Sequence, residues 1–600
     1  MTSCGEISLH PPRSAAGRAS RRAHRRLTLL LSAAAAVHAG PAAAQLATGL
    51  GPVGTAPAGT APTILPPPPS GPFGLPNPLT SPNALPSGVI PTPATPPTPP
   101  LGLPAPGAGI IPLQAYDPNA PAILIQPTAT LGERFTDNIN YTATHRTAGV
   151  ETMLIPGVSI SADTPRFTGV LSGSASGNIY TPASNLNQLT ANLYGNGTGT
   201  VLPDHLFVDA ASYITQGSTL PGLGFLQPSL LPSNQQTQVY SNTVSPYFRQ
   251  SIYGLLDTEL RYRFGATNFG GTTAIASTTS PFASNLASGI LNEGTLTATT
   301  GQDFERAISR LTIDGSSFNS SSTSQNKQFS AFDDIEYRIR PNISALGRAG
   351  YQDIEYPFAP AATFRGVTWL AGGRLGSAAD YGYVSLEYGR VQGVYGFTGS
   401  ANYQVTPTIT VEANLAQGIE SPGESFQTSL AGSTLSPEGT IVDQYSGLPT
   451  AFYNPGLGLN NNVYRQHLYN VGVNDQIGVN TYSIYGYFIN QQSLTPPITP
   501  ATDSTGASFT WGRAIRPDLN GNASLGYFRT TNVVTINTLT PVNNTSIITA
   551  NIGLNYAFAR ALTGSIYYTF SYQPNGGTIV SGQSGNIVVN SLQLLLTKAF

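Results

Sequence analysis

The chain has 600 residues, only 9% of which are charged, and its formal net charge at pH 7 is −2. An average soluble domain has about 25% charged residues, so this composition argues against a series of ordinary soluble domains. A balance so near zero also argues against nucleic acid or an anionic surface as the partner. The single cysteine, Cys4, gives no basis for a disulfide framework or a thiolate metal site.

The first 44 residues have the pattern of a secretory signal peptide. The basic run RRAHRR (21–26) precedes an apolar stretch, LTLLLSAAAAVHA (27–39). That stretch is too short for a membrane-spanning helix, which needs about 20 residues. Small residues at Ala42 and Ala44 precede Gln45, and this pattern predicts cleavage before Gln45.

Residues 45–120 form a proline-rich segment with stretches such as TILPPPPSGP and PTPATPPTPPLGLPAP. Proline removes backbone donors and favours polyproline II, so we expect no packed core here. One interpretation is a disordered linker. The alternative is an arm that docks to the cell wall or to a partner, as proline-rich segments can.

From residue 121 onward, apolar and polar residues alternate in runs of about 9 to 14 residues, a pattern typical of a transmembrane β-barrel. In LLDTELRYRFG (255–265), Leu260 and Phe264 share one face while Glu259 and Arg261 share the other. The same period occurs in YGYVSLEYGR (381–390) and SIITANIGLNYAF (546–558). No later segment is apolar enough for a spanning helix, so a closed barrel is the remaining way to satisfy a backbone in lipid.

The lengths of the connections predict which end of the barrel each of them lies at. Short ones, at 341–342, 406–407, 517–518 and 560–561, alternate with long polar ones, at about 218–237, 266–293, 419–462 and 574–586. Short periplasmic turns and long outer loops are the rule in such barrels. We therefore predict an all-β fold over 121–600: a transmembrane antiparallel β-barrel of about 22 strands, within 20–22 and even. Both chain ends and the proline-rich segment would then lie in the periplasm.

The last ten residues, SLQLLLTKAF, alternate as a strand does, with Leu592, Leu594, Leu596 and Phe600 on one face. A closed barrel needs its last strand to pair with its first, which explains an apolar strand at this position. The final aromatic strand resembles the signal that the outer-membrane barrel assembly machinery recognises. Lys598 stands where such signals commonly have an aromatic residue, and its long side chain could reach the periplasmic rim.

Several stretches resemble the beta-barrel porin family associated with exosortase (PEP-CTERM) and exopolysaccharide loci of Gram-negative bacteria. They are LGERFTDNINY (131–141), LPDHLFVDAASYITQ (202–216), SPYFRQSIYGLLDTELRYRFG (245–265), GYQDIEYPF (350–358), VTWLAGGRL (367–375) and SLEYGR (385–390). The resemblance covers about 121–600. It implies an outer-membrane location and a part in surface polysaccharide export, without a mechanism.

Catalysis finds little support in the sequence, and no cofactor or metal is expected. His145, His205 and His467 are scattered, with no spacing that would bind zinc. GSASG (173–177) has Ala175 where a nucleophile elbow has serine. We therefore expect a protein that is not an enzyme.

The best functional candidates are charged residues predicted to face the barrel lumen: Arg249, Asp257, Glu259, Arg261, Arg263, Asp334, Glu336, Arg338, Arg340, Arg348, Arg374 and Glu387. The hairpin at Pro341 should bring Arg348 opposite Asp334. One interpretation is a ladder of ion pairs that holds the wall in register, and the other is a charged constriction that sets selectivity. Acidic residues are expected to be absent from the lipid-facing side, where they would be costly. Tyr141, Tyr351, Tyr388 and Tyr485 are either lipid anchors or a surface along which a sugar chain slides.

Three functions fit these observations. The first is a conduit or accessory in exopolysaccharide export, the second a general diffusion porin for small solutes, and the third an outer-membrane anchor whose proline-rich arm reaches the cell wall. The expected partners are outer-membrane lipid, the barrel assembly machinery, and polysaccharide or polysaccharide-export proteins. An oligomer is compatible with all three, and a loop such as 419–462 could fold inward. A TonB-coupled receptor would need a folded plug, which residues 45–120 cannot supply.

Overall fold

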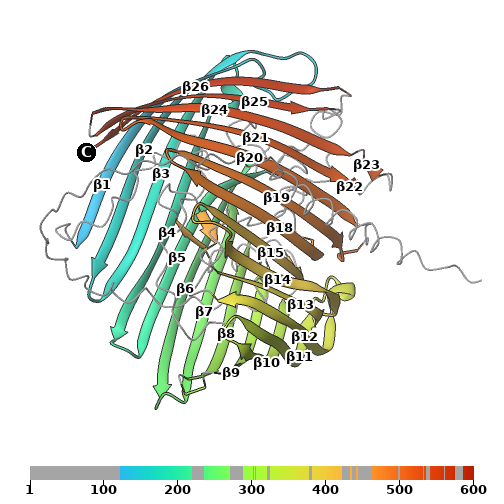
Figure 1. Ribbon diagram of the computed structural model, residues 1–600. Helices are drawn as coiled ribbons and strands as arrows, with labels where there is room; N and C mark the ends of the chain where they lie inside the picture. The colour runs from blue at the N-terminus through green and yellow to red at the C-terminus, as the bar shows by residue number, and fades with distance from the viewer. Residues whose placement is uncertain are drawn as a thin grey trace, which may run out of the picture. The chain divides into compact units, whose positions relative to one another are not determined.

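The alternating residues form 22 long strands, which join edge to edge into a closed antiparallel barrel in the computed structural model (Figure 1). The structure describes residues 122–600 apart from 219–235, 271–287, 302, 305, 321–324, 378–381, 422–423, 425–432, 436–440, 444–461, 497–500, 532, 535–540, 543, 560 and 575–584. The predicted signal peptide, its cleavage site and the proline-rich segment lie outside the described residues. In the described part of the chain, no helix is long and apolar enough to cross a membrane.

The first half of the barrel consists of β1 (Ile123–Thr136), β2 (Gly149–Thr164), β3 (Phe167–Thr181), β4 (Gln188–Leu202), β5 (Leu206–Ser218), β6 (Gln236–Ile252), β7 (Leu256–Gly270), β8 (Gly289–Thr300), β9 (Ala307–Ser320), β10 (Asn326–Arg340) and β11 (Ile343–Glu355). The second half consists of β12 (Phe364–Ser377), β13 (Gly382–Val391), β14 (Val394–Gln404), β15 (Ile409–Glu420), β18 (Tyr464–Ile477), β19 (Asn480–Ser493), β20 (Thr502–Arg516), β21 (Leu519–Thr531), β24 (Thr545–Ala559), β25 (Leu562–Gln573) and β26 (Ile587–Ala599). Two small hairpins, β16–β17 (Ser433–Leu435 and Ile441–Asp443) and β22–β23 (Val533–Val534 and Pro541–Val542), and two 3-10 turns, η1 (Ser184–Leu186) and η4 (Pro360–Ala362), complete the described elements.

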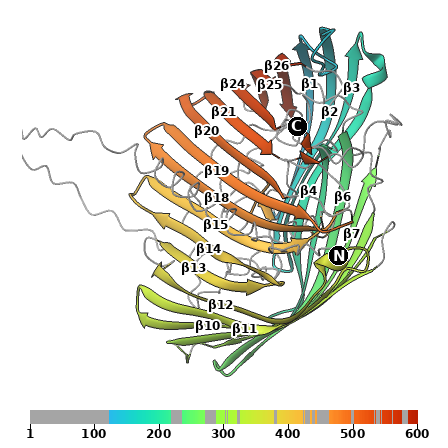
Figure 2. The same ribbon diagram turned by 90° about the vertical axis from the view of Figure 1, so that its right-hand side faces the viewer.

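The last strand closes the barrel onto the first. Strand β26 pairs with β25 on one side and with β1 on the other, in a register that runs from Thr128 opposite Ala599 to Thr136 opposite Ser591. The backbone N–H of Phe600 extends this seam by donating to the carbonyl of Pro127 at 3.0 Å. Figures 1 and 2 both show β26 beside β1. The predicted all-β fold and the predicted count of 22 strands are confirmed.

The two faces of the wall differ as the alternation predicts. Apolar side chains face outward and are exposed, as Leu260 (59%) and Ile552 (60%) are, whereas inward neighbours such as Glu259 (6%) and Asn551 (8%) are covered. On β26, Leu592, Leu594, Leu596 and Phe600 are all exposed on the outer side. An apolar outer surface on a closed barrel is the arrangement that a lipid environment requires.

The two ends of the barrel differ in their connections. At one end, which we call the short-turn end, successive strands are joined by tight turns such as 341–342, 478–479 and 517–518. At the other, the long-loop end, most connections are longer, but β13 and β14 meet there in a two-residue turn at Gln392 and Gly393. Both turn residues have positive φ, 52° and 77°, as a type I′ turn requires. The predicted alternation of short and long connections thus holds, with this turn as the exception.

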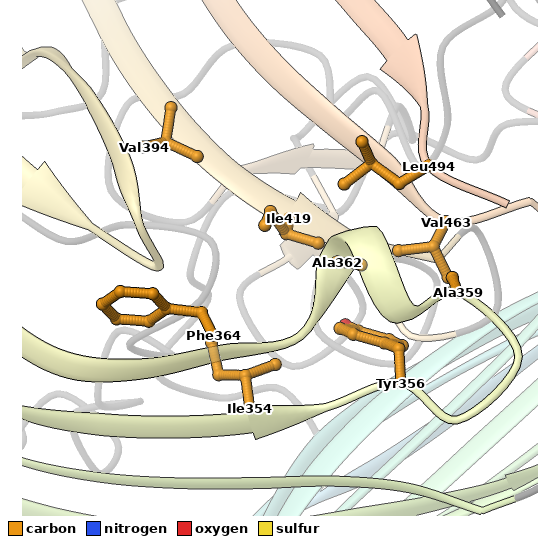
Figure 3. Close-up of a cluster of buried hydrophobic side chains, with 9 residues drawn as sticks. All are labelled: Ile354, Tyr356, Ala359, Ala362, Phe364, Val394, Ile419, Val463 and Leu494. Carbon is orange, nitrogen blue, oxygen red and sulfur yellow. The ribbon is translucent and has the colours of Figure 1, made fainter. Parts of the chain in front are cut away.

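A cluster of buried apolar side chains lies at the long-loop end between β11 and β19 (Figure 3). Tyr356, from the loop after β11, is fully buried within it. Beside the cluster, Glu424 is 4% exposed, and its carboxylate accepts hydrogen bonds from Tyr356 Oη (3.0 Å), Ser421 Oγ (2.8 Å) and Asn326 Nδ2 (3.1 Å). Asn326 lies on the inward face of β10, so the described start of the β15–β18 connection turns inward. The rest of the 419–462 segment lies mostly outside the described residues.

The connection between β1 and β2 also turns inward. Tyr141 is fully buried, and its hydroxyl donates to Gln573 Oε1, on the inward face of β25, at 3.2 Å. Burial raises the pKa of the Tyr141 hydroxyl well above its ordinary value, which keeps the proton on this donor. Ile139 of the same loop packs against Tyr180 and Leu186. Two connections of the long-loop end are therefore fixed to the inner wall by buried polar contacts.

Candidate functional site

The inward-facing charges gather on one part of the wall, the inner face of β5–β13, which we call the charged arc. Its described carboxylates are Asp209, Asp257, Glu259, Glu293, Asp314, Asp334, Glu336 and Glu387, and its described arginines are Arg249, Arg261, Arg263, Arg310, Arg338, Arg348 and Arg374. All the predicted lumen charges belong to this set except Arg340. A bulge after Arg338 pairs Arg340 with the outward Ile343, so the predicted lumen position of Arg340 is wrong. Formal charge therefore nearly cancels within the arc.

The first network in the charged arc is built around Arg261 of β7. Its Nε atom bonds Glu259 Oε1 and its Nη1 atom bonds Asp209 Oδ2, both at 2.8 Å. Glu259 also accepts from Arg249 Nε at 2.7 Å. The Arg261 guanidinium carbon lies 3.9 Å from the ring centroid of Tyr247, a cation–π contact. Four charges from three adjacent strands thus neutralise one another over an aromatic ring.

A second network continues on β7, β8 and β9. Arg263 forms a buried ion pair with Glu293, the residue directly opposite it in the β7–β8 register. Thr295 Oγ1 donates to Asp314 Oδ2 on β9 at 2.8 Å. The Arg263 guanidinium and the Thr295 hydroxyl thus interact with two buried carboxylates.

The third network is the one predicted at the Pro341 hairpin. Asp334 stands opposite Arg348 in the β10–β11 register, and the pair is bidentate, with Nε–Oδ1 at 2.6 Å and Nη2–Oδ2 at 2.9 Å. This predicted contact is confirmed. Glu336, which is fully buried, forms ion pairs with Arg374 and Arg338 and accepts from Ser344 Oγ at 2.8 Å.

The remaining predicted charges are Asp257, Arg340 and Glu387. Asp257 and Arg340 are exposed near the short-turn end, whereas Glu387 is 6% exposed on the inward face of β13, near Arg348 and Asp334 of the third network. The structure therefore brings most of the predicted residues together.

Several inward charges were not among the predicted ones. They include Asp209, Glu293, Arg310 and Asp314 in the charged arc, the ion-paired Arg134 and Glu151 on β1 and β2, Asp163 on β2 and Glu412 on β15. The alternation around Arg134, between outward Phe135 and Glu133, was a sufficient signal for its inward position. The pairing of Arg261 with Asp209, 52 residues away, has no local signal, because it depends on the register of three strands.

Several carboxylates, among them Asp333 and Glu133, contradict the expected absence of acidic residues from the outer face. Asp333, next to inward Asp334, faces outward between exposed Phe329 and Tyr337 and accepts from Ser309 Oγ at 2.7 Å. Glu133 faces outward on β1 and accepts from Thr152 Oγ1 at 3.0 Å. Neighbouring residues of a strand must point to opposite faces, so one of two adjacent aspartates was bound to face outward.

The opposite part of the wall, the inner face of β18–β26, carries hydroxyl and amide side chains and is called the neutral arc here. None of its described inward positions carries a charged side chain. Arg516, at the short-turn end, follows a bulge, lies over the outward Tyr556 and pairs with Asp518. Figures 1 and 2 show β18–β21 across the barrel from β4–β7. The lumen therefore has a charged, nearly balanced side and an uncharged side.

The four tyrosines considered in the sequence have different surroundings. Tyr351 (41% exposed) and Tyr388 (44%) face outward, as lipid anchors would. Tyr141 lies in the β1–β2 loop, and only Tyr485 lines the lumen, within the neutral arc.

The described inward residues offer polar groups for recognition. Within them, no three or more His, Cys, Asp or Glu side chains are grouped so as to hold a metal ion. His205 has its ring 5.9 Å from that of Phe248, close to the β4–β5 turn, and is remote in sequence from the other two histidines. In the charged arc, most charged side chains form ion pairs with one another. In the neutral arc, hydroxyl and amide groups face the lumen.

Comparison with known proteins assigns the chain to no family. No family model matches it, and no curated protein does so either. Solved structures with a similar arrangement include a mutant of the ferric enterobactin receptor PfeA from Pseudomonas aeruginosa (10% identity, 79% of this chain and 80% of that chain, TM-score 0.39). Two others are the FrpB iron transporter from Neisseria meningitidis (9%, 79% and 81%, 0.44) and the ferric-catecholate import receptor Fiu from E. coli (10%, 79% and 81%, 0.43). TM-scores below 0.5 at this identity assign neither a family nor a ligand.

Proposed function

We propose that this protein is an outer-membrane barrel that transports a hydrated, uncharged polymer, with surface polysaccharide as the substrate class. The observation that carries the proposal is the inner wall, which combines a charged arc of nearly balanced sign with a neutral arc of amides and hydroxyls. Such a wall can hydrogen-bond a hydrated chain without holding it by net charge. The family resemblance seen in the sequence points to the same substrate class.

The outer membrane is the proposed location because the sheet is closed and its outward face carries many exposed apolar side chains. In lipid, only closed barrels and helices leave no backbone group unpaired. The short-turn end would face the periplasm and the long-loop end the exterior, as in other barrels of this kind. The transport proposal includes no enzymatic step.

The export proposal is tested by deleting the chromosomal copy and weighing secreted polysaccharide. We expect the yield to fall and a plasmid copy to restore it. A plasmid encoding Asn551→Arg, which puts an unpaired cation into the neutral arc, should restore it poorly. The outward neighbour variant Ala550→Leu is the matched control and should restore it fully. Unchanged yield and chain length in the deletion strain would contradict export.

A general diffusion porin is the alternative, because a polar lumen also passes small solutes. Purified protein in planar bilayers distinguishes the two in combination with the deletion. Channels together with unchanged polysaccharide would favour the porin. If refolded protein gives no channel events, a porin is excluded.

A further inference from the structure

The neutral arc contains two transverse rows in which aromatic rings lie against glycines. In the first, Tyr487 of β19 stands opposite Gly506 of β20, which stands opposite Phe528 of β21. In the second, Asn522 of β21 stands opposite Gly553 of β24, which stands opposite Tyr567 of β25. The rows are three two-residue steps apart, about 20 Å along the strands.

The glycines allow the rings to lie along the wall. A Cβ atom at Gly506 would overlap the rings of both Tyr487 and Phe528, and one at Gly553 would overlap the ring of Tyr567. Tyr487 and Phe528 are nearly parallel, with ring centroids 6.3 Å apart and an interplanar angle of 25°. Tyr485, one step along β19, lies 6.3 Å from Tyr487. These rings form an aromatic floor on the inner wall, where Tyr485 and Phe528 are partly exposed and Tyr487 and Tyr567 present only small parts of their surface, 7% and 8%.

Amide oxygens beside this floor have no donor within the protein. Asn522 and Asn551 are 7% and 8% exposed, and the Oδ1 atom of each accepts no protein hydrogen bond. The same holds for Asn470, opposite Tyr487, and Asn474. The Nδ2 group of Asn551 is used, because it donates to Ser524 Oγ at 3.2 Å. Four amide oxygens on this wall are therefore acceptors without a protein donor, close to flat apolar rings, and the same wall also holds a buried donor without an acceptor, Gln573 Nε2.

A neutral glycan complements both features, since its hydroxyls are donors and its ring faces are apolar C–H surfaces. An anionic chain would bring acceptors to acceptors, which form no hydrogen bond. We propose that the inner face of β18–β25 is a binding track for a neutral glycan, with Tyr487, Phe528 and Tyr567 as stacking platforms and Asn522 and Asn551 as acceptors. The track rests on the proposed function in that it names the surface the exported chain would contact.

The test measures binding by the full-length protein refolded in detergent, with isothermal titration calorimetry and three probes: maltohexaose, cellohexaose and chitohexaose. We expect at least one probe to bind, and hexagalacturonate to bind more weakly than that probe. Phe528→Ala, Tyr487→Ala and Tyr567→Ala should each weaken binding about three- to tenfold, the range expected for one aromatic contact. Asn551→Ala should weaken it about threefold.

The chain offers a matched control beside each ring. Tyr527, Phe488 and Tyr568 are the sequence neighbours of the three platform residues and lie on the outward face of the same strands. Their alanine variants should change the dissociation constant less than twofold. Heat-modifiable migration in gels shows whether each variant still forms the barrel.

Two results would overturn the track: no probe binds the wild-type protein, or inward and outward variants lose affinity equally. Neither result depends on the deletion experiment. If no probe binds and deletion still lowers secreted polysaccharide, the track alone is wrong. If a probe binds at the predicted rings and deletion has no effect, the transport function alone is wrong.

Discussion

The charged arc and the neutral arc form the two sides of the same lumen with opposite chemistry. In the charged arc, side chains satisfy one another: Arg261 alone bonds two carboxylates, and Glu336 has three partners. In the neutral arc, buried amide oxygens such as those of Asn522 and Asn551 are left without a protein donor. Buried polar atoms without a partner occur in both arcs, since Arg261 Nη2 and Glu336 Oε2 also have none. The arcs differ in that ion pairs link neighbouring strands of the charged arc, whereas the inner wall of the neutral arc carries neutral amides and hydroxyls.

The closure of the barrel runs through the neutral arc, and deleting residues 587–600 should have the largest effect. Strand β26 pairs with both β25 and β1. Its loss would leave two unpaired sheet edges in lipid, so no barrel should form. Heat-modifiable migration of protein from isolated outer membranes is the measurement. Lys598→Tyr is the control and should assemble normally, whereas a normal barrel from the truncated chain would show that closure does not need β26.

Phe600→Ala separates recognition from folding at the same seam. The Phe600 side chain is 73% exposed, and the seam uses only its backbone N–H. We therefore expect the variant to refold in detergent as the wild type does but to be assembled poorly in cells. Equal assembly in cells would show that the final aromatic residue is not part of the assembly signal.

Most of the fold could be predicted from the sequence because period-2 alternation is a local property. The faces of β7, β13 and β24, the tight turns and the count of 22 strands all follow from it. The networks of the charged arc are less accessible, since Asp209 meets Arg261 only through the register of β5, β6 and β7. The inward course of Tyr141 and Glu424 is likewise fixed by partners on distant strands, Gln573 and Asn326.

Alanine substitutions in the two arcs should have unequal effects on stability. Glu336→Ala removes the buried carboxylate that pairs with Arg374 and Arg338, and breaking a buried ion pair from one side costs about 3 to 5 kcal/mol. Ser524→Ala removes one acceptor for Asn551 and should cost about 1 kcal/mol. Urea unfolding in lipid vesicles measures both. The double variant Glu336→Ala/Arg374→Met should recover part of the lost stability. If Glu336→Ala and Ser524→Ala lower the free energy of unfolding by similar amounts, the two arcs do not differ in their contribution to stability.

The adjacent residues Asp333 and Asp334 test the two faces within the charged arc. Asp333→Leu removes a carboxylate from the outward apolar surface and should raise the free energy of unfolding by about 1 kcal/mol, since acidic groups at that depth cost less than the roughly 2 to 4 kcal/mol of basic ones. Asp334→Asn, the matched control, should lower it because it removes the carboxylate that forms the bidentate pair with Arg348. A loss of stability in both variants would mean that Asp333 has a role the outward apolar surface does not explain.

The smallest effects are expected on ion selectivity, because the charges of the arc nearly balance. A bilayer with a salt gradient should give the wild-type channel a reversal potential near zero. Arg348→Gln leaves an excess of carboxylates and should shift selectivity toward cations, whereas Asp334→Asn should shift it toward anions, both less at high salt. Gln593→Asn, on the inward face of uncharged β26, should leave it unchanged. If Arg348→Gln and Asp334→Asn shift the reversal potential equally and in the same direction, the electrostatic field of the lumen is set outside the charged arc. If they shift it in opposite directions, ion pairing, rather than a lack of charge, keeps this side of the lumen neutral.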